Sequence, residues 1–256
     1  MTRFTRALVR RPCRNLVHGL SSALPALPPD WGKALEQHAA YVEALRGCGL
    51  EVTALDADEE FPDSVFIEDT AVLCGGTAVL CRLGAASRQG EEKQVALALS
   101  PLFPRLEAIL APGTLEGGDV MLAGGRFYVG LSSRTNREGA RQLGEILGRL
   151  GREAVPVPLS AVLHLKTGVS CLGEGLLLAS GEFLQHGVFD RFTLVAVPAG
   201  EEYAANSLRV NDRVLVPAGF PKTRRAIEKA GLETLAVDVS EFRKLDGGLS
   251  CLSLRF

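Results

Sequence analysis

Two stretches of the chain, residues 126–157 and 212–237, repeat one order of hydrophobic and polar positions. Each has a short apolar run, then apolar residues at three- and four-residue steps, then a glycine and a second apolar run. Short apolar runs are typical of buried strands, and the three- and four-residue steps are typical of amphipathic helices. The glycines, Gly151 and Gly231, fall where a left-handed helix cap is expected. Each stretch therefore predicts a strand, a helix and a second strand.

The same order recurs less regularly in three other parts of the chain. One copy runs from a strand at 77–81 into a helix that ends near Leu99, and another has a helix at 31–46 that stops at Gly47. The last has a strand at 175–179 followed by a poorer helical pattern. Five units average about 51 residues each, which lies in the range of propellers and other repeat arrays. The chain is therefore expected to have an α/β fold with five pseudo-symmetric repeats.

Such units are too small to bury their apolar faces alone, so we expect them to close around an axis as a single domain over residues 1–256. No linker rich in Pro, Gly or Ser divides the chain. Residues 4–9 are β-prone and precede Pro12, which predicts a first strand. Residues 20–30 contain three prolines and predict a mobile loop.

Charge and cysteine usage narrow the function classes. The chain has 28 Lys and Arg against 30 Asp and Glu, a net charge of −2 that argues against nucleic acid as an obligate partner. The 46% of hydrophobic residues excludes disorder, and no apolar run is long enough for a membrane span. Six cysteines without a CxxC pair or a secretory segment predict a reduced, cytoplasmic protein. Five arginines and no acid before residue 30 also suit a mitochondrial presequence, with the first strand as the competing interpretation.

Carboxylates interrupt two otherwise apolar segments. Asp63, Glu68 and Asp69 lie in the strand-like stretch 61–70, where burial is costly unless a cation meets them. The alternative is a solvated acidic turn. In residues 113–120, Glu116 and Asp119 flank a Gly-Gly pair that permits close backbone approach, although a simple hairpin turn has the same composition.

A cysteine and a histidine add reactive groups. Cys251 follows a glycine pair near the C-terminus, and His164 alternates with apolar neighbours; taken separately, each is typical of a core residue. The other histidines are weaker candidates, because His38 is expected to face out of a helix and His18 and His186 fall in loops. Together, a thiolate can act as nucleophile and an imidazole can take up its proton and return one to a leaving group.

Zinc is the rival chemistry for such residues, but the short ligand spacings of a closed zinc site are missing. Thiol, imidazole and several carboxylates suit a planar cation instead, because paired acids hold a guanidinium through its fork geometry. The thiolate would attack the guanidinium carbon, and the imidazole would protonate a departing amine, which leaves a covalent thiouronium on the cysteine. Hydrolysis of that thiouronium would give a urea.

The chain resembles dimethylarginine dimethylaminohydrolases, of the guanidino-modifying superfamily, over essentially its whole length. The motifs that carry the resemblance are RALVRRP at 6–12, PDSVFIED at 62–69, LEGGD at 115–119, GLSSRT at 130–135, LHLK at 163–166, NSLRVN at 206–211 and the tail around Cys251. The resemblance implies a five-bladed α/β propeller, the pentein fold. It also implies hydrolysis of Nω,Nω-dimethyl- or Nω-monomethyl-L-arginine to L-citrulline and the methylamine, with no cofactor and no metal.

Matching the motifs residue by residue implies specific roles. Cys251 corresponds to the nucleophile, His164 to the general acid and base, and Glu116 to the acid beside the guanidinium. The residues matched to substrate binding are Glu68 and Asp69 at the guanidinium, Asp63, Arg88 and Arg134 at the amino-acid end, and Leu20 and Leu245 through their carbonyls. Arg82 is an alternative to Arg88. Residues 16–30 would form a lid over the ligand.

Two other functions remain open at this stage. An arginine deiminase would use the same nucleophile and acid on unmethylated arginine, but members of that family are typically longer, with a helical insertion that this chain has no room for. A non-catalytic pentein-fold binding protein would have no need of Cys251, His164 and Glu116 together. A homodimer through a blade face is compatible with the architecture.

Overall fold

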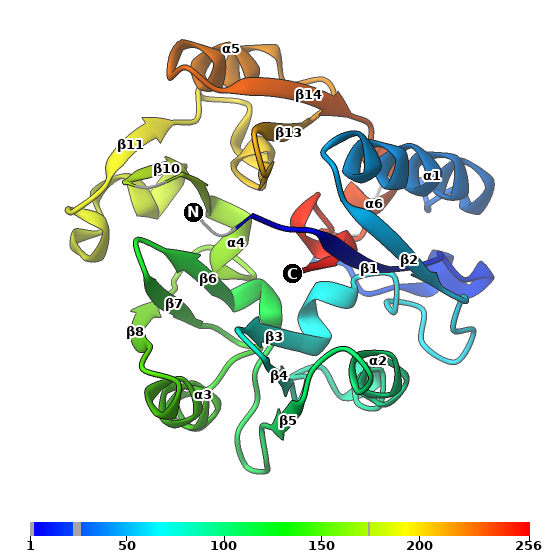
Figure 1. Ribbon diagram of the computed structural model, residues 1–256. Coiled ribbons are helices and arrows are strands. Elements are labelled where there is room, and N and C mark those ends of the chain that lie inside the picture. Colours follow the sequence, from blue (N-terminus) through cyan, green and yellow to red (C-terminus); the bar gives the residue numbers. More distant parts are fainter. Residues whose placement is uncertain (1–2, 23–26, 174) are drawn as a thin grey trace. The chain divides into compact units, whose positions relative to one another are not determined.

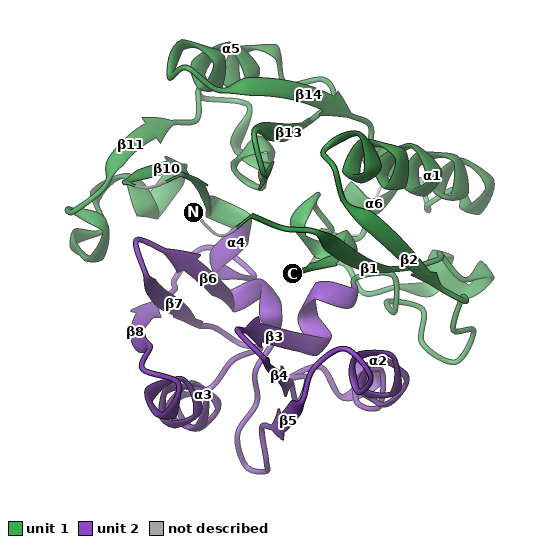
Figure 2. Ribbon diagram, in the orientation of Figure 1, with its two compact units in different colours: residues 1–66, 167–256 green, residues 67–166 purple. Residues whose placement is uncertain are grey.

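The computed structural model describes residues 3–22, 27–173 and 175–256. The chain divides into two compact units, one made of residues 1–66 and 167–256 and the other of residues 67–166 (Figure 2). Among the described residues, no helix has both the length and the apolar character needed to cross a bilayer. The closure of residues 1–256 into one domain around an axis stays a prediction.

The unit 67–166 holds two sheets of three strands (Figure 1). In each sheet the central strand pairs antiparallel with the strand before it and parallel with the strand after it. The strands are β3 (Ala71–Cys74), β4 (Thr77–Leu80) and β5 (Arg105–Ala108) in one sheet, and β6 (Val120–Ala123), β7 (Arg126–Leu131) and β8 (Glu153–Pro158) in the other. The parallel crossovers contain α2 (Glu92–Leu99) and α3 (Arg137–Arg149).

Local sequence explains the bounds of α3. The side chain of Asn136 accepts a hydrogen bond from the Gly139 N–H, which caps the helix start. Leu143 and Leu147, one turn apart, are fully buried. Gly151 then adopts φ +69°, a left-handed conformation that glycine reaches without a Cβ clash. The predicted strand, helix, glycine and strand order is confirmed here.

The unit 1–66 with 167–256 repeats the same strand order three times. Its sheets are β15 (Leu254–Arg255), β1 (Arg6–Arg10) and β2 (Glu51–Leu55); β9 (Val169–Gly173), β10 (Leu176–Ala179) and β11 (Thr193–Ala196); and β12 (Leu208–Val210), β13 (Arg213–Pro217) and β14 (Glu233–Val237). Its helices are α1 (Trp31–Gly47), α5 (Pro221–Lys229) and α6 (Ser240–Arg243), and α4 (Leu165–Gly168) precedes β9. The described residues thus contain five copies of one three-stranded unit, as the sequence repeats predicted.

Short 3-10 helices complete both units. They are η1 (Arg14–His18), η2 (Ile67–Thr70), η3 (Ala86–Arg88), η4 (Gly117–Asp119), η5 (Gly181–Gln185), η6 (Gly187–Phe189), η7 (Glu202–Ala205) and η8 (Ser250–Leu252). Between β10 and β11, η5 and η6 stand where the other crossovers have an α-helix. Phe183 and Phe189 are buried there, with ring centroids 6.1 Å apart, so packed aromatic rings cover the sheet where the helical pattern was poor.

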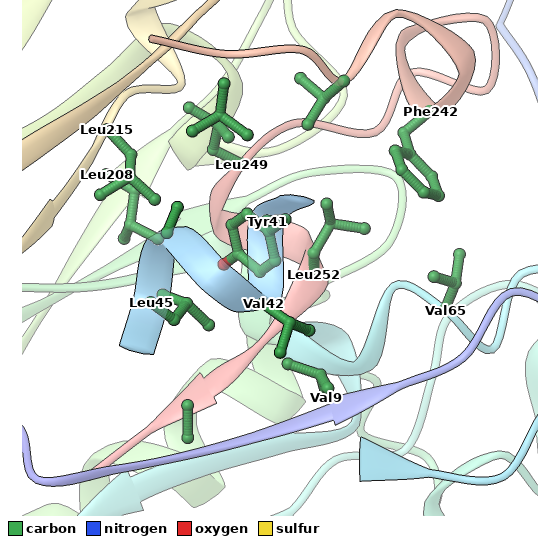
Figure 3. Packing of buried hydrophobic residues seen from close by; sticks show 14 of the residues in the cluster. Val9, Tyr41, Val42, Leu45, Val65, Leu208, Leu215, Phe242, Leu249 and Leu252 are labelled. Carbon is green, nitrogen blue, oxygen red and sulfur yellow. The ribbon is translucent and has the colours of Figure 1, made fainter. Parts of the chain in front are cut away.

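A large core of the unit 1–66 with 167–256 lies beneath the C-terminal segment (Figure 3). Tyr41 and Leu45 of α1 pack there together with Leu249 and Leu252, and each of these side chains is fully buried. Each buried leucine contributes about 1.5–3 kcal/mol of transfer free energy. The Tyr41 hydroxyl also bonds to Ser253 Oγ at 2.6 Å. This packing holds η8, which carries Cys251, against the helix α1.

Two local predictions were wrong. Residues 61–70 form turns and the 3-10 helix η2 instead of a strand-like stretch. His38 is buried, 4% exposed, and burial lowers its pKa to about 4. The predicted end of the first helix at Gly47 is confirmed, because α1 ends at that residue, and the left-handed residue after it is Gly49, at φ +88°.

Candidate active site

A buried carboxylate and an imidazole form a direct pair in the unit 67–166. His164 Nε2 lies 2.7 Å from Glu116 Oε2, and the Glu116 side chain is fully buried. The other oxygen of Glu116 accepts the backbone N–H groups of Gly84 and Ala85 at 3.0 and 3.3 Å. It also lies 3.5 Å from the Arg134 guanidinium. These donors fix the carboxylate so that one oxygen faces the imidazole.

Asp69 supplies a second buried carboxylate at the same place. Its Oδ1 accepts the N–H of Gly118 at 2.9 Å, and its Oδ2 lies 2.7 Å from Arg88. Arg88 in turn bonds both oxygens of Glu91, through Nε at 2.9 Å and Nη2 at 2.8 Å. The guanidinium is thus held in a fork by one carboxylate and presents its remaining edge to another. A carboxylate oxygen accepts more than one donor, so Asp69 retains capacity for a ligand N–H.

The Gly-Gly pair of the LEGGD motif allows these side chains to approach the backbone. A Cβ atom on Gly118 would lie 2.9 Å from both Asp69 Oδ1 and His164 Nδ1, and one on Gly117 would overlap the Glu68 carbonyl. The segment forms the 3-10 helix η4 and not a hairpin turn. Close approach, not turn formation, therefore accounts for the glycines.

Surrounding charges set the protonation of this cluster. Burial by itself lowers the pKa of His164, but the negative charge of Asp69 and the hydrogen bond to Glu116 outweigh it and raise that pKa to about 9. Burial opposes ionisation of Asp69, yet the positive charges of His164 and Arg88 lower its pKa to about 2. Burial opposes ionisation of Glu116 too, but the hydrogen bond with His164 and the positive charges of His164 and Arg88 together lower its pKa. At neutral pH the site holds an imidazolium between two carboxylates.

Asp119 lies behind this pair and connects three segments. It is fully buried, accepts the backbone N–H of Leu165 at 3.0 Å and accepts the Ser132 hydroxyl at 2.7 Å. Ser132 Oγ accepts the N–H groups of Arg134 and Thr135. Burial raises the pKa of Asp119. One carboxylate thus ties the LEGGD segment to the backbone beside His164 and to the turn that carries Arg134.

Glu68 meets a cation from the chain itself. Lys166 Nζ lies 2.6 Å from Glu68 Oε1, and both side chains are largely buried. The expectation that a cation must accompany the buried acids is confirmed for Glu68 and, through Arg88, for Asp69. Arg82 instead donates to the Gly113 carbonyl at 3.3 Å, so the structure brings Arg88, and not Arg82, to Asp69.

Three of these side chains, Asp69, Glu116 and His164, offer ligand atoms that all lie within 4.8 Å of one another. Their chemistry fits a metal poorly. The Nε2 of His164 is bonded to Glu116, and both carboxylates already face a guanidinium, from Arg88 and Arg134. The ligand atoms of these side chains are therefore already engaged by donors within the protein.

The unit 1–66 with 167–256 contains the predicted nucleophile. Cys251 lies in η8, is partly exposed, and its Sγ accepts the N–H of Gly248 at 3.4 Å. Its neighbour Ser250 is buried and bonds to Asn206 through its N–H at 2.9 Å and its hydroxyl at 3.1 Å. Cys251 thus packs against the core of this unit and is also partly exposed.

Three predicted binding residues lie together in that unit. The Leu20 N–H donates to Asp63 Oδ1 at 3.0 Å, and Asp63 is buried. A Cβ atom on Gly19 would lie 2.8 Å from Leu245 Cδ1 and 3.0 Å from Asp63 Oδ1. The start of the predicted lid is thus anchored beside Asp63. Part of that lid, residues 23–26, lies outside the described residues.

The predicted residues therefore fall into two sets. The unit 67–166 gathers Glu68, Asp69, Arg88, Glu116, Arg134 and His164, and the other unit gathers Leu20, Asp63 and Leu245 and holds Cys251. Sequence reasoning left the roles of Glu91, Asp119 and Lys166 unassigned. Two of them lie within motifs, Asp119 in LEGGD and Lys166 in LHLK, which is the signal that could have identified them.

Comparison with known proteins shows the family of the chain. Residues 31–253 match a family model described as N,N dimethylarginine dimethylhydrolase, eukaryotic. The chain is 47% identical to an N(G),N(G)-dimethylarginine dimethylaminohydrolase from Pseudomonas aeruginosa, over 99% of this chain and 100% of that protein. It is 40% identical to one from Streptomyces coelicolor, over 98% of this chain and 96% of that protein.

Solved structures match equally well. The Pseudomonas aeruginosa enzyme, as a cysteine-to-serine variant in complex with citrulline, has a TM-score of 0.97 at 46% identity over the whole of both chains. The N-terminal domain of a cyanobacterial arginine dihydrolase has a TM-score of 0.89 over 99% of this chain and 97% of that domain, at 20% identity, which bears on the fold alone. The fold is thus the predicted pentein type, with five α/β repeats. The chain belongs to the dimethylarginine dimethylaminohydrolase family.

Proposed function

We propose that this chain hydrolyses Nω,Nω-dimethyl-L-arginine, and Nω-monomethyl-L-arginine, to L-citrulline and dimethylamine or methylamine. The observation that carries the proposal is the imidazolium of His164, held 2.7 Å from buried Glu116 in a chain of this family. A charged imidazole can protonate a departing amine, which is the step that an amine leaving group most needs. The citrulline complex of the Pseudomonas aeruginosa relative supports citrulline as the product.

The first half of the proposed reaction forms a covalent intermediate. The Cys251 thiolate attacks the guanidinium carbon and forms a C–S bond, giving a tetrahedral centre. His164 then gives its proton to the methylated nitrogen, the C–N bond breaks, and dimethylamine leaves. A thiouronium remains on Cys251. A histidine-to-glycine variant of a related enzyme forms an adduct with S-methyl-L-thiocitrulline, which supports attack at this carbon.

The second half consumes one water molecule. The now neutral imidazole of His164 removes a proton from water, and the resulting hydroxide attacks the thiouronium carbon. The C–S bond breaks and Cys251 leaves as thiolate. The added hydroxyl loses its proton to solvent as the carbonyl forms, and citrulline is released. Glu116 favours the charged imidazole in both halves through its hydrogen bond, since an opposite charge at this distance stabilises the protonated form. The mechanism requires Cys251 and His164 to reach one guanidinium carbon.

Substrate binding divides between charges of opposite sign. Asp69 and Glu116 would hold the guanidinium, and Glu68, held in place by Lys166, would add negative charge. Arg88 and Arg134 would face the α-carboxylate, while Asp63 and the carbonyls of Leu20 and Leu245 would hold the α-ammonium. Residues 16–30 would close over the ligand. This arrangement suits a free amino acid, which carries both terminal charges.

The test is a comparison of citrulline release from dimethylarginine and from arginine by the purified protein. Turnover of dimethylarginine with little release from arginine is expected. Preference for arginine would favour the deiminase alternative, and binding without turnover of either would favour a non-catalytic protein.

All six cysteines are free thiols, which supports a reduced, cytoplasmic setting. A homodimer stays a prediction, to be tested by sedimentation velocity.

A further inference from the structure

The peptide group between Gly247 and Gly248 is bonded on both of its polar sides. Its N–H, from Gly248, donates to Cys251 Sγ at 3.4 Å. Its C=O, from Gly247, accepts the Tyr203 hydroxyl at 2.6 Å. Both bonds use one planar unit, so a rotation of that unit breaks them together. The tyrosine is therefore connected to the sulfur through a single rigid group.

A hydrogen bond to the carbonyl also strengthens the donor at the other end. Polarisation of an amide by an O–H donor makes its N–H a better donor, and hydrogen bonds in series reinforce one another. An N–H that points at a sulfur stabilises the thiolate more than the thiol, because the anion is the stronger acceptor. The Tyr203 hydroxyl can thus act on Cys251 without contact with a substrate.

Neighbouring aromatic and cationic groups hold Tyr203 in this role. Arg243 lies over its ring, with the guanidinium carbon 4.7 Å from the centroid, and the Phe220 ring lies 5.5 Å away. Burial and then the charge of Cys251 raise the pKa of Tyr203 well above its usual range. The hydroxyl therefore keeps its proton and remains a donor at every pH at which the protein functions.

The two glycines have no room for a side chain. A Cβ atom on Gly247 would overlap the Phe66 ring, and one on Gly248 would overlap Asn206, which itself bonds to Ser250. Packing therefore confines this peptide from the side, while Tyr203 sets its rotation. The NSLRVN motif begins at Asn206, three residues after Tyr203. The helix η7 and the residue that follows it therefore contact this peptide twice, through the Tyr203 hydroxyl and through the Asn206 side chain.

We propose that Tyr203 is a positioning residue for the nucleophile, acting through the Gly247–Gly248 peptide to hold an N–H on Cys251 Sγ. The proposal rests on the proposed function, in which Cys251 attacks the guanidinium carbon. It assigns to Tyr203 a share in the reactivity of the thiol, with no contact to the substrate.

The test is the pH dependence of Cys251 alkylation by iodoacetamide in wild type and Tyr203→Phe, without substrate. Trypsin releases residues 245–255, whose one cysteine is Cys251, so mass spectrometry follows this thiol alone. We expect the midpoint of the pH profile to move upward by about half a unit to one unit, the effect of weakening one hydrogen bond to the anion. We also expect kcat to fall about threefold to tenfold with KM within about twofold.

Tyr41→Phe is the control, because it also removes a tyrosine hydroxyl that is hydrogen-bonded at 2.6 Å, here to Ser253 in the same C-terminal segment. It is expected to lower stability and leave the alkylation midpoint in place. An unchanged midpoint in Tyr203→Phe, or an equal shift in both variants, would overturn the proposal. If Tyr203→Phe does not fold, Arg243→Lys keeps the charge at an exposed position and loses the planar stacking.

For Arg243→Lys, an upward shift of the pH midpoint of Cys251 alkylation supports the proposal, and an unchanged midpoint overturns it. Failure of the proposed function is a separate result, since it shows as wild-type protein that does not turn over dimethylarginine while its alkylation profile can still be measured.

Discussion

The imidazole of His164 and the carboxylate of Glu116 form a 2.7 Å pair in which the acid is fully buried. A buried acid in contact with an imidazole keeps the ring protonated at a pH where a solvent-exposed histidine would be neutral. Burial alone would lower the pKa of His164, but the charge of Asp69 and then the hydrogen bond to Glu116 raise it to about 9. This pair converts a histidine, usually a poor acid above pH 7, into a proton donor for an amine leaving group.

Removing the Glu116 charge is expected to weaken this donor. Glu116→Gln should move the basic limb of the pH dependence of kcat downward by about one to two units, because an opposite charge in contact shifts a pKa by that much. At pH 8, kcat should fall by about twofold to tenfold, the loss in the protonated fraction of His164 that this shift produces. Steady-state kinetics between pH 6 and 10 measure both. Glu138→Gln on helix α3 is the control, and a basic limb that stays in place in Glu116→Gln would refute the assignment.

The same pair makes stability depend on pH. The pKa of His164 in the folded protein, about 9, lies above its ordinary value of 6.5. Its contribution is therefore fully present below about pH 6.5 and is lost as the pH rises through 9, a change of roughly 3 kcal/mol in the free energy of unfolding. Urea unfolding of wild type and His164→Gln over this range measures the difference. Parallel curves for the two proteins would contradict the prediction.

Arg88 is expected to serve both stability and binding. Arg88→Lys keeps a charge but cannot span Glu91 and Asp69 at once, so it should lower the free energy of unfolding by about 1–3 kcal/mol and raise KM by about tenfold. Urea unfolding and steady-state kinetics measure these effects. Arg82→Lys is the matched control, since Arg82 bonds a carbonyl and no acid. A larger rise in KM for Arg82→Lys than for Arg88→Lys would favour the alternative assignment.

Asp119 is expected to position the site without touching the substrate. In Asp119→Asn, the amide must turn an N–H₂ toward either the Leu165 N–H or the Ser132 hydroxyl, which costs about 1–3 kcal/mol of unfolding free energy. The basic limb of kcat should also move downward, because Asp119 adds to the negative charge around His164. Unchanged stability and an unchanged limb would show that the network has no such role.

The repeated units could be predicted because their signals are local. The helix α3 has its cap, its apolar spacing and its closing glycine within one short stretch, and the chain needs no distant partner to define it. Residues 61–70 lacked such a signal. Their apolar residues suggested a strand, whereas Glu68 and Asp69 meet Lys166 and Arg88 from the 3-10 helix η2.

The sequence predicted which residues belong to the candidate site, but not which side chains pair with one another there. Motifs identified Glu116 and His164, whereas the cations that neutralise the acids come from positions whose contacts span tens of residues, such as Lys166 with Glu68. The exposure of His38 was predicted wrongly for a different reason. Its place on an amphipathic helix suggested exposure, but α1 is covered on more than one face, and tertiary packing buries the ring.

Mass spectrometry of the protein, quenched with acid during turnover of dimethylarginine, tests the central claim most directly. We predict a covalent adduct of the thiouronium mass on peptide 245–255 in wild type, and neither adduct nor citrulline in Cys251→Ser. Citrulline formation by Cys251→Ser, or an adduct on another cysteine of a protein that turns over, would contradict the account.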